Sequence, residues 1–350
     1  MDILASFLPS HGANATASFA DFATPNTNLP YGADLYTGTD PSSLNFLERA
    51  WMDWYIWIGN PVIATGLMSF LLHEFVYFGR AIPWIIIDSM PSMRKYKLQE
   101  DKTATPAQQW KCTKYVLLTH FTVELPQIWS FHPLCEYLGL ATHSVPFPHW
   151  TKMAWQIGLF FLFEDMFHYW AHRALHWGPL YKHIHKKHHE FSAPFGLAAE
   201  YAHPLEVIIL GMGTVGGPFL FCALTKDLHI LTVYVWIVMR LFQAIDAHSG
   251  YDFPWSMHNW VPFWAGADHH DHHHMAFVGC YSTSFRWWDH LMGTDLSYKR
   301  FRARQAEEKR KAKEAGLEWP TKPATKTATG ALLSKEKGYS IGEGETKKTL

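Results

Sequence analysis

Histidines recur in three short clusters between residues 168 and 274 of this 350-residue chain. The members are His168 and His172, then His185, His188 and His189, and finally His269, His270, His273 and His274. Neutral imidazole is the commonest side-chain metal ligand, and residues four positions apart share one face of a helix. Each cluster contains such a four-residue step, so each can close two imidazoles on one ion.

The number of these histidines exceeds what one ion needs. The economical interpretation is a two-metal centre that keeps open positions for a reactant. The alternative is a set of solvated histidines, or a low-complexity histidine tract that binds metal loosely. A random tract would not repeat one spacing at three separated places amid apolar, Trp-rich sequence, so we favour the two-metal centre.

Carboxylates stand beside the candidate ligands, where they could accept ring N–H bonds and fix the tautomers. They are Glu164, Asp165, Glu190, Asp246 and Asp271. Solvated loop charges are the competing interpretation.

The composition indicates a membrane protein. Aromatic residues make up 16% of the chain and charged residues only 17%, which is rich in the first and poor in the second for a soluble domain. The four cysteines are scattered without pairing spacing, and no cleavable signal peptide opens the chain, so we expect free thiols. The net charge of −1 gives no reason to expect a nucleic-acid partner.

The first half of the chain offers two candidate membrane segments. Residues 54–72 are uncharged and of spanning length, although Asn60 and Pro61 interrupt them. Residues 116–140 are a poorer candidate because they carry Glu124 and two prolines, and we interpret them as a broken or re-entrant helix. Residues 153–163 are too short to span, so we expect a helix at the interface or buried in the protein that leads into His168.

Residues 207–224 and 229–244 have the pattern of a membrane hairpin joined by a short polar turn. Arg240 lies near the end of the second helix and could snorkel to the interface. A hairpin returns to the face that it left. The sequence therefore predicts that the histidines on either side of it converge on one site.

The tail favours a cytosolic orientation for that site. Residues 299–350 hold fourteen Lys or Arg against seven Asp or Glu, a net charge of +7, and end in the di-lysine pattern KKTL of endoplasmic reticulum retrieval signals. Basic residues between 94 and 114 also favour the cytosol. They can lie on the same side as the histidine site if residues 116–140 are re-entrant and do not cross the membrane. The N-terminus would then be lumenal, where Asn14 is a possible glycosylation site, although a chance match is the alternative.

The sequence thus predicts an all-α, polytopic membrane protein with a helical, histidine-rich di-metal domain on the cytosolic side. We expect a disordered segment at 1–45, an N-terminal membrane region at 46–150, a catalytic domain at 151–298, and a basic, largely disordered tail at 299–350.

The sequence around the clusters narrows the function. The motifs are ED (164–165), HYWAHR (168–173), HKKHHEF with APFG (185–196), EYAHPLE (200–206), DAHSGYD (246–252), HHDHHH (269–274), FRWWD (285–289) and GTD (293–295). Together they resemble the membrane fatty acid hydroxylase and sterol desaturase superfamily, and within it the fungal-type sterol C4-methyl oxidases. The three clusters alone are shared with fatty acyl desaturases, whereas the whole combination, over about residues 54–295, is specific.

The resemblance implies a set of eleven metal ligands for two non-haem iron ions. They are His168, His172, His185, His188, His189, His203, His248, His269, His270, His273 and His274. For His203 and His248, a structural histidine outside the ligand set is nearly as good an interpretation. Three further histidines fit no ligand position and are expected to be surface or neighbouring residues: His176, His183 and His272.

The resemblance also implies the reaction and its partners. It predicts a monooxygenase that uses dioxygen to oxidise the C4-methyl group of a sterol precursor to alcohol, aldehyde and carboxylate, at the endoplasmic reticulum membrane. Because the chain has no nucleotide or flavin fingerprint, electrons would come from cytochrome b5 and its NAD(P)H-dependent reductase. A sterol C3-dehydrogenase/decarboxylase would act next.

Two other functions remain open. A fatty acyl or sphingolipid hydroxylase or desaturase would share the chemistry and differ only in substrate. A membrane zinc transporter or metal buffer belongs to another class, but transporters place ionisable ligands within their spans, whereas the apolar hairpin contains no histidine cluster.

Overall fold

The computed structural model describes residue 36 and residues 38–317. These residues form helices joined by loops and isolated β-bridges, which confirms the all-α expectation. The KKTL terminus, Asn14 and most of the two end segments predicted to be disordered lie outside the described residues. Residues 38–45 form the turn η3 (Pro41–Ser43) and the cap of the first helix.

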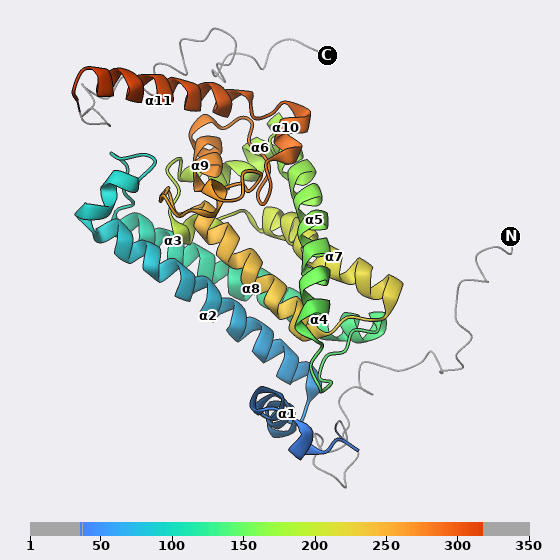
Figure 1. The fold of residues 1–350 in the computed structure, drawn as a ribbon. Coiled ribbons are helices and arrows are strands. Elements are labelled where there is room, and N and C mark those ends of the chain that lie inside the picture. The colour runs from blue at the N-terminus through green and yellow to red at the C-terminus, as the bar shows by residue number, and fades with distance from the viewer. Residues whose placement is uncertain (1–35, 37, 318–350) are drawn as a thin grey trace, which may run out of the picture.

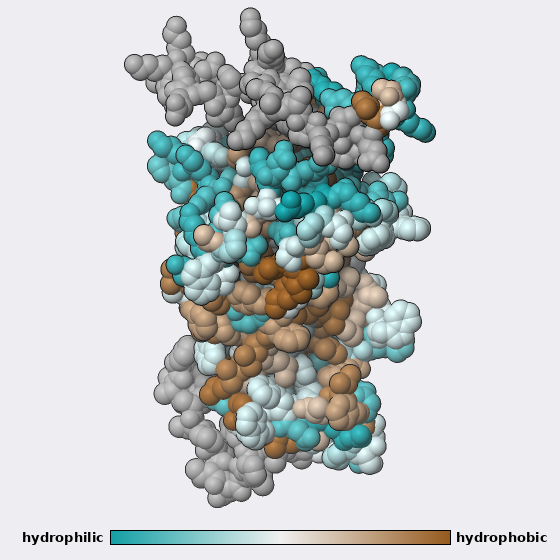
Figure 2. Space-filling model, turned by 90° about the vertical axis from the view of Figure 1, so that its left-hand side faces the viewer, coloured by the Kyte–Doolittle hydropathy of each residue, from teal (hydrophilic) through white to brown (hydrophobic). Residues whose placement is uncertain are grey.

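Within the described part of the chain, three helices are long and apolar enough to cross a membrane: α2 (Pro61–Ser89), α7 (Pro204–Thr225) and α8 (Ile230–Ala247). On α2, Leu71, Phe75, Ile82 and Ile86 are each more than half exposed, and their spacing places them on one helix face. Figure 2 shows that hydrophobic residues gather below the hydrophilic upper end of the molecule. We therefore describe the chain as a membrane protein.

The predicted span at 54–72 is wrong because the chain breaks inside it. Helix α1 (Phe46–Ile58) ends at Gly59, whose φ of 69° is a left-handed conformation that suits glycine. Asn60 then caps α2 by accepting a hydrogen bond from the backbone N–H of Ile63, and Pro61 occupies the first turn, where a proline costs no hydrogen bond. The two residues that interrupt the apolar run therefore start the spanning helix.

Residues 116–140 do not form a re-entrant loop. The helices α3 (Pro106–Thr119) and α4 (Leu125–Leu138) are joined without a gap by a π-helical turn, η5 (His120–Glu124). This run begins near the bridge between Lys97 and Tyr251 and ends near the bridge between Ala141 and His229, at opposite ends of the molecule. It lies antiparallel to α2 and passes from one end to the other (Figure 1).

Helix α5 (Trp150–Leu175) returns the chain to the end that carries α9 (Ala267–Ala276) (Figure 1). It packs closely on α7 because glycines of α7 face aromatic rings of α5. A Cβ added to Gly213 would lie 2.7 Å from Cδ1 of Phe167, and one on Gly217 would lie 3.1 Å from Cδ1 of Phe163. The small residues Gly213 and Gly217 of α7 thus let α5 approach closely, and this packing fixes the position of α5, which carries His168 and His172.

The hairpin of α7 and α8 is as the sequence predicts. Its tip is held by backbone hydrogen bonds, from the Ala141 N–H to the Leu228 carbonyl and from the Ile230 N–H to the Ala141 carbonyl. Arg240, however, does not snorkel. Its guanidinium is buried and lies 2.8 Å from a carboxylate oxygen of Glu164, because α8 turns this face toward α5 rather than toward lipid.

The remaining described elements complete the α9 end. They are η4 (Pro91–Tyr96), α6 (Gly178–His183), η6 (His185–Glu190), η7 (Gly196–Glu200), η8 (Met257–Asn259), α10 (Trp287–Met292) and α11 (Leu296–Glu314). The start of the basic tail is therefore helical. All four cysteines are free, as expected, and all four are buried.

Candidate metal centre

Nine histidines meet at the α9 end in two groups. The first, which we call the five-histidine cage, contains His172, His176, His185, His189 and His273. The second, the four-histidine cage, contains His188, His248, His270 and His274. Within each group, the candidate ligand atoms all lie within 4.8 Å of one another.

Two short helices contribute to both cages. On η6, His188 points into the four-histidine cage while its neighbour His189 joins the other. On α9, His270 and His274, four residues apart, share the face toward the four-histidine cage, and His273 turns to the five-histidine cage. The two cages therefore lie on either side of η6 and α9, as a two-metal centre requires.

The ring nitrogens Nε2 face inward in both cages. In the five-histidine cage, Nε2 of His185 lies 3.1 Å from that of His172 and 3.0 Å from that of His189. Nε2 of His273 lies 3.1 Å from that of His189 and 3.2 Å from that of His176.

The four-histidine cage repeats this arrangement. Nε2 of His248 lies 3.3 Å from that of His188 and 2.9 Å from that of His270. Nε2 of His274 lies 3.1 Å from that of His270.

In three of the cage rings, the opposite ring nitrogen fixes the tautomer. Nδ1 of His172 donates to the Tyr281 carbonyl (2.8 Å), that of His273 to the Gly279 carbonyl (2.6 Å), and that of His248 to the Ala244 carbonyl (2.8 Å). A carbonyl can only accept, so each of these rings carries its proton on Nδ1 when neutral. Its Nε2 lone pair then points into the cage.

Burial keeps the imidazoles neutral. It lowers the pKa of His248 to about 4. It also holds the pKa of the cage histidines of η6 and α9 well below the ordinary value: His185, His188, His189, His270, His273 and His274. Neutral rings are the form that binds metal.

The cages fit cations rather than hydrogen bonds. Lone pairs about 3 Å apart repel one another unless a positive charge lies between them. Bonds of about 2.1 Å to a metal place ligand atoms about 3.0 Å apart at right angles and about 3.4 Å apart at tetrahedral corners. The seven Nε2 separations, 2.9 to 3.3 Å, favour the first arrangement.

The cages contain eight of the eleven histidines predicted as ligands. The other three lie outside. His168 has Nδ1 3.2 Å from a Glu164 oxygen, His203 uses Nδ1 to cap the Leu205 N–H at 3.2 Å, and Nε2 of His269 lies 3.5 Å from an Asp289 oxygen.

The ninth cage member, His176, was expected to be a surface or neighbouring residue. The sequence did carry a signal for it, because His168, His172 and His176 repeat the four-residue step along one helix face. His183 is exposed, as expected, whereas His272 is buried and lies 3.2 Å from the Ser297 hydroxyl, next to the cages rather than in them.

Five carboxylates were predicted to accept ring N–H bonds from the histidines of the three sequence clusters. Only Glu164 contacts one of these histidines, namely His168. Asp165 accepts backbone N–H bonds from Ser284 and Phe285, and Asp246 accepts from Arg80. The carboxylate that holds a cage ring is Glu206, 2.8 Å from Nδ1 of His185. Sequence reasoning missed it because the contact joins the first turn of α7 to η6.

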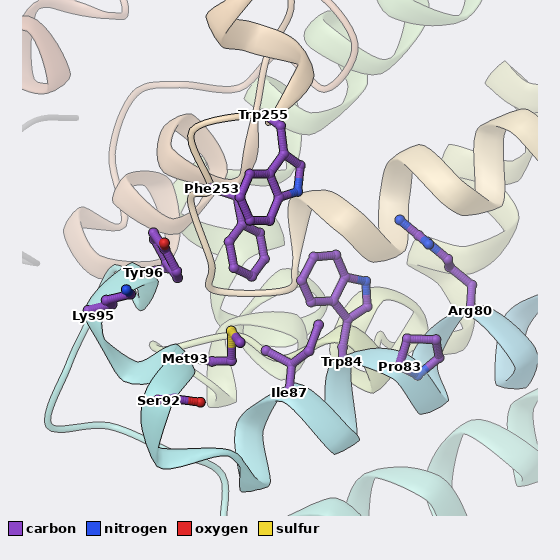
Figure 3. A pocket seen from close by; sticks show the side chains of 10 residues that line it. All are labelled: Arg80, Pro83, Trp84, Ile87, Ser92, Met93, Lys95, Tyr96, Phe253 and Trp255. Atoms are coloured by element: carbon purple, nitrogen blue, oxygen red, sulfur yellow. The ribbon is translucent and has the colours of Figure 1, made fainter.

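Two surface pockets lie near the cages. One, of about 570 Å³, is lined by His189 of the five-histidine cage together with His203, Phe277, Lys182 and Lys186. The other, of about 480 Å³, is walled by aromatic rings at the end of α2, including Trp84, Tyr96, Phe253 and Trp255 (Figure 3). Arg80 and Lys95 stand at its edge.

Comparison with known proteins adds a family to this geometry. Residues 157–294 match the model of the family described as fatty acid hydroxylase. The chain is 63% identical to methylsterol monooxygenase erg25B of Aspergillus fumigatus over 262 residues, which are 75% of this chain and 88% of the relative.

Other organisms hold similar proteins. Identity is 62% to C-4 methylsterol oxidase erg25 of Schizosaccharomyces pombe, over 75% of this chain and 87% of the relative. It is 45% to methylsterol monooxygenase 1 of Rattus norvegicus, over 66% of this chain and 77% of the relative. No solved structure matches the chain.

Proposed function

The chain belongs to the C-4 methylsterol oxidases of the fatty acid hydroxylase family, and we propose that it is a di-iron monooxygenase that oxidises the C4-methyl group of sterol precursors. The observation that carries this proposal is the convergence of nine inward-facing Nε2 atoms in two adjacent cages. The successive products would be alcohol, aldehyde and carboxylate, and dioxygen is the oxidant.

Each cage would hold one iron ion. Bound iron supplies the activation of dioxygen for attack on an unactivated C–H bond, and an all-imidazole set suits iron. The chain's own residues keep the rings neutral by burial and orient His172, His185, His248 and His273 through Nδ1. We further propose that His168 is an additional ligand or positions His172, whose ring centroid lies 5.6 Å away, and that His203 and His269 hold neighbouring structure.

The aromatic pocket of Figure 3 is our candidate for sterol entry. Its volume of about 480 Å³ lies within the range of small-molecule sites, and its walls are apolar. The rings of Trp84 and Tyr251 stack with centroids 6.1 Å apart, and Trp84 donates to Asp246, two residues before the cage ligand His248. A sterol leaving the bilayer along α2 would therefore arrive beside the four-histidine cage.

The second pocket is our candidate for electron delivery. Lys182 and Lys186 at its edge are exposed cations, and His189 in its wall belongs to a cage. Such a surface attracts an acidic protein and brings it close to the metals. Cytochrome b5, reduced by its NAD(P)H-dependent reductase, fits this role, and a sterol C3-dehydrogenase/decarboxylase would take the carboxylate product.

We propose that the α9 end faces the cytosol from the endoplasmic reticulum membrane. The basic residues Arg94, Lys95 and Lys97 lie at this end, as does the basic helix α11 (Figure 1). Positive residues favour the cytosolic side. With the run 106–138 passing through rather than returning, these residues and the cages share one side without a re-entrant segment.

Conversion of a 4,4-dimethylsterol by microsomes that contain the full chain tests the function. With NAD(P)H and oxygen present, we expect the C4 carboxylate from the wild type and none from the His188→Ala/His273→Ala double variant, which removes a ligand from each cage. His290→Ala is the matched control, because this exposed histidine lies outside both cages and outside the lining of both pockets, and should leave the product unchanged.

The result also separates the rival substrate. If iron and cytochrome b5 are present but no sterol product forms, hydroxylation of fatty acyl or sphingolipid chains becomes the better assignment.

A further inference from the structure

Five ionisable side chains gather near the middle of α2, outside both histidine cages. They are His73 and Glu74 of α2, His120 and Glu124 of η5, and Glu200 of η7. We call them the His/Glu cluster. Ionisable residues in spanning helices are rare, and where they occur they usually mark a function.

The backbone at this point is itself unusual. His120 and Glu124 are the first and last residues of the five-residue π-helix η5. Such turns are uncommon and frequently occur at functional sites. The π turn directs both side chains toward α2, and His120 has no exposed surface.

The Nε2 atoms of the two histidines face the same two carboxylates. Nε2 of His73 lies 3.3 Å from Glu124 and 3.2 Å from Glu200. Nε2 of His120 lies 3.7 Å from Glu124 and 2.9 Å from Glu200. These contacts use both oxygens of each carboxylate, and the two nitrogens lie with one oxygen of each carboxylate within 4.8 Å of one another, between three elements of the fold.

The Nδ1 atoms face a third carboxylate. Nδ1 of His120 lies 2.7 Å from Oε1 of Glu74, and Nδ1 of His73 lies 3.4 Å from the same oxygen. One carboxylate therefore receives both ring N–H groups. This is the pattern of an outer carboxylate that orients metal-binding imidazoles.

The charges of the cluster require a cation. All four ring nitrogens face carboxylate oxygens, but a neutral imidazole has only one N–H, so its other nitrogen would set a lone pair against an anion. Two additional positive charges resolve this conflict. They are either two protons or one divalent metal ion.

The geometry favours the metal ion. Nε2 of His73 has two carboxylate oxygens at nearly equal distance, 3.2 and 3.3 Å, whereas a single N–H can point at only one of them. A central ion contacts both. The two Nε2 atoms and one oxygen from each of Glu124 and Glu200 all lie within 4.8 Å of one another, so these four side chains can share a single ion.

We propose that the His/Glu cluster binds one zinc ion through Nε2 of His73, Nε2 of His120, Glu124 and Glu200, as a structural site separate from the two cages. Nitrogen ligands select a transition metal over calcium or magnesium. Four protein ligands fill a tetrahedral zinc site and leave no open position, which is typical of structural zinc. The ion would join α2, η5 and η7 within the membrane region.

Metal analysis of the purified, iron-loaded full-length chain in detergent tests this site. We expect about one zinc per chain beside about two iron ions. In Glu124→Gln, zinc should fall at least about tenfold while iron is unchanged, because the variant alters a ligand of this cluster alone. Glu100→Gln, at an exposed carboxylate in the loop before α3, is the matched control and should keep all its metals.

The proposal is overturned if the wild type holds no zinc, or if the Glu124→Gln variant holds as much zinc as the wild type. In either case the His/Glu cluster holds no zinc, any zinc that is found occupies the cages, and two protons balance the charges of the cluster. Zinc X-ray absorption on the wild type gives the same decision without a variant. Mixed imidazole and carboxylate ligands support the site, and imidazole ligands alone refute it.

Discussion

The histidine cages and the His/Glu cluster both surround a candidate metal position, but they differ in what orients their rings and in which atoms face the metal. In the cages, three ring Nδ1 atoms donate to backbone carbonyls and the candidate ligand atoms are all nitrogen. In the His/Glu cluster, both Nδ1 atoms face the Glu74 carboxylate, and carboxylates also share the ligand positions.

The difference lies in how the metal's charge is balanced. Glu124 and Glu200 supply two negative charges in the His/Glu cluster, enough to neutralise a divalent ion. Neutral imidazoles leave the charge of an ion in a cage uncompensated. A cage therefore retains affinity for oxygen ligands from outside the protein, which a reactive centre needs, whereas the His/Glu cluster is satisfied by its own residues.

The largest expected effect distinguishes the cages, which are needed for oxidation, from the His/Glu cluster, which has a structural role. His270→Ala removes a ligand of the four-histidine cage and should lower turnover of the sterol by about 10³-fold or more, since metal activation of the reactant is lost. Glu124→Gln should retain most of the turnover per folded, iron-loaded chain. Turnover measured per bound iron checks both, and equal losses would remove the distinction between the two sites.

The next effect concerns the membership of the five-histidine cage. His176→Ala should lower iron content and sterol oxidation more than His168→Ala, because Nε2 of His176 lies in the cage while His168 contacts Glu164. We expect a difference of about tenfold. Iron content per chain and turnover should be measured together. A larger loss in His168→Ala would place that residue, and not His176, among the ligands.

Glu206 and Glu74, the carboxylates that face ring Nδ1 atoms, allow a further comparison of the cages with the His/Glu cluster. Glu206→Gln weakens the acceptor of the His185 ring and should lower iron affinity by about 10- to 100-fold without changing zinc. Glu74→Gln should weaken zinc by a similar factor and leave iron unchanged. Competition with a chelator measures both affinities. If either variant weakened both metals, the two sites would be coupled rather than independent.

The smallest effect concerns packing. Gly213→Ala places a Cβ 2.7 Å from Phe167 and should destabilise the chain by about 1–3 kcal/mol, with a lower thermal unfolding temperature. Gly211→Ala, on the same helix, places its Cβ in open space and serves as the control. Metal content of the folded fraction should stay the same in both. A metal loss in Gly213→Ala would mean that helix packing also sets ligand geometry.

Local periodicity predicted much of this molecule. The four-residue steps identified His172 on α5 and His270, His273 and His274 on α9 as cage members, although His168 and His269 lie outside, and two long apolar stretches gave the α7 and α8 hairpin. Eight of the eleven predicted ligands lie in the cages, since ligand spacing on one helix is a local property.

The parts that sequence reasoning missed depend on contacts between distant segments. Arg240 is buried because Glu164 faces it from α5, and Glu206 reaches His185 from the start of α7. The His/Glu cluster joins residues 73, 120 and 200, and His73 and Glu74 look like interruptions of an apolar helix until η5 and η7 are placed beside them. No window of sequence contains these pairs.

The order of the ligands along the chain has a consequence for biosynthesis. Every residue of the His/Glu cluster has been synthesised once Glu200 is added, whereas the cages need His273 and His274. During translation, the first site can therefore form before the hairpin of α7 and α8 exists, and the reactive one only after nearly all of the membrane region has been made. A ribosome stalled between these points would hold a nascent chain able to retain zinc but with neither iron cage complete.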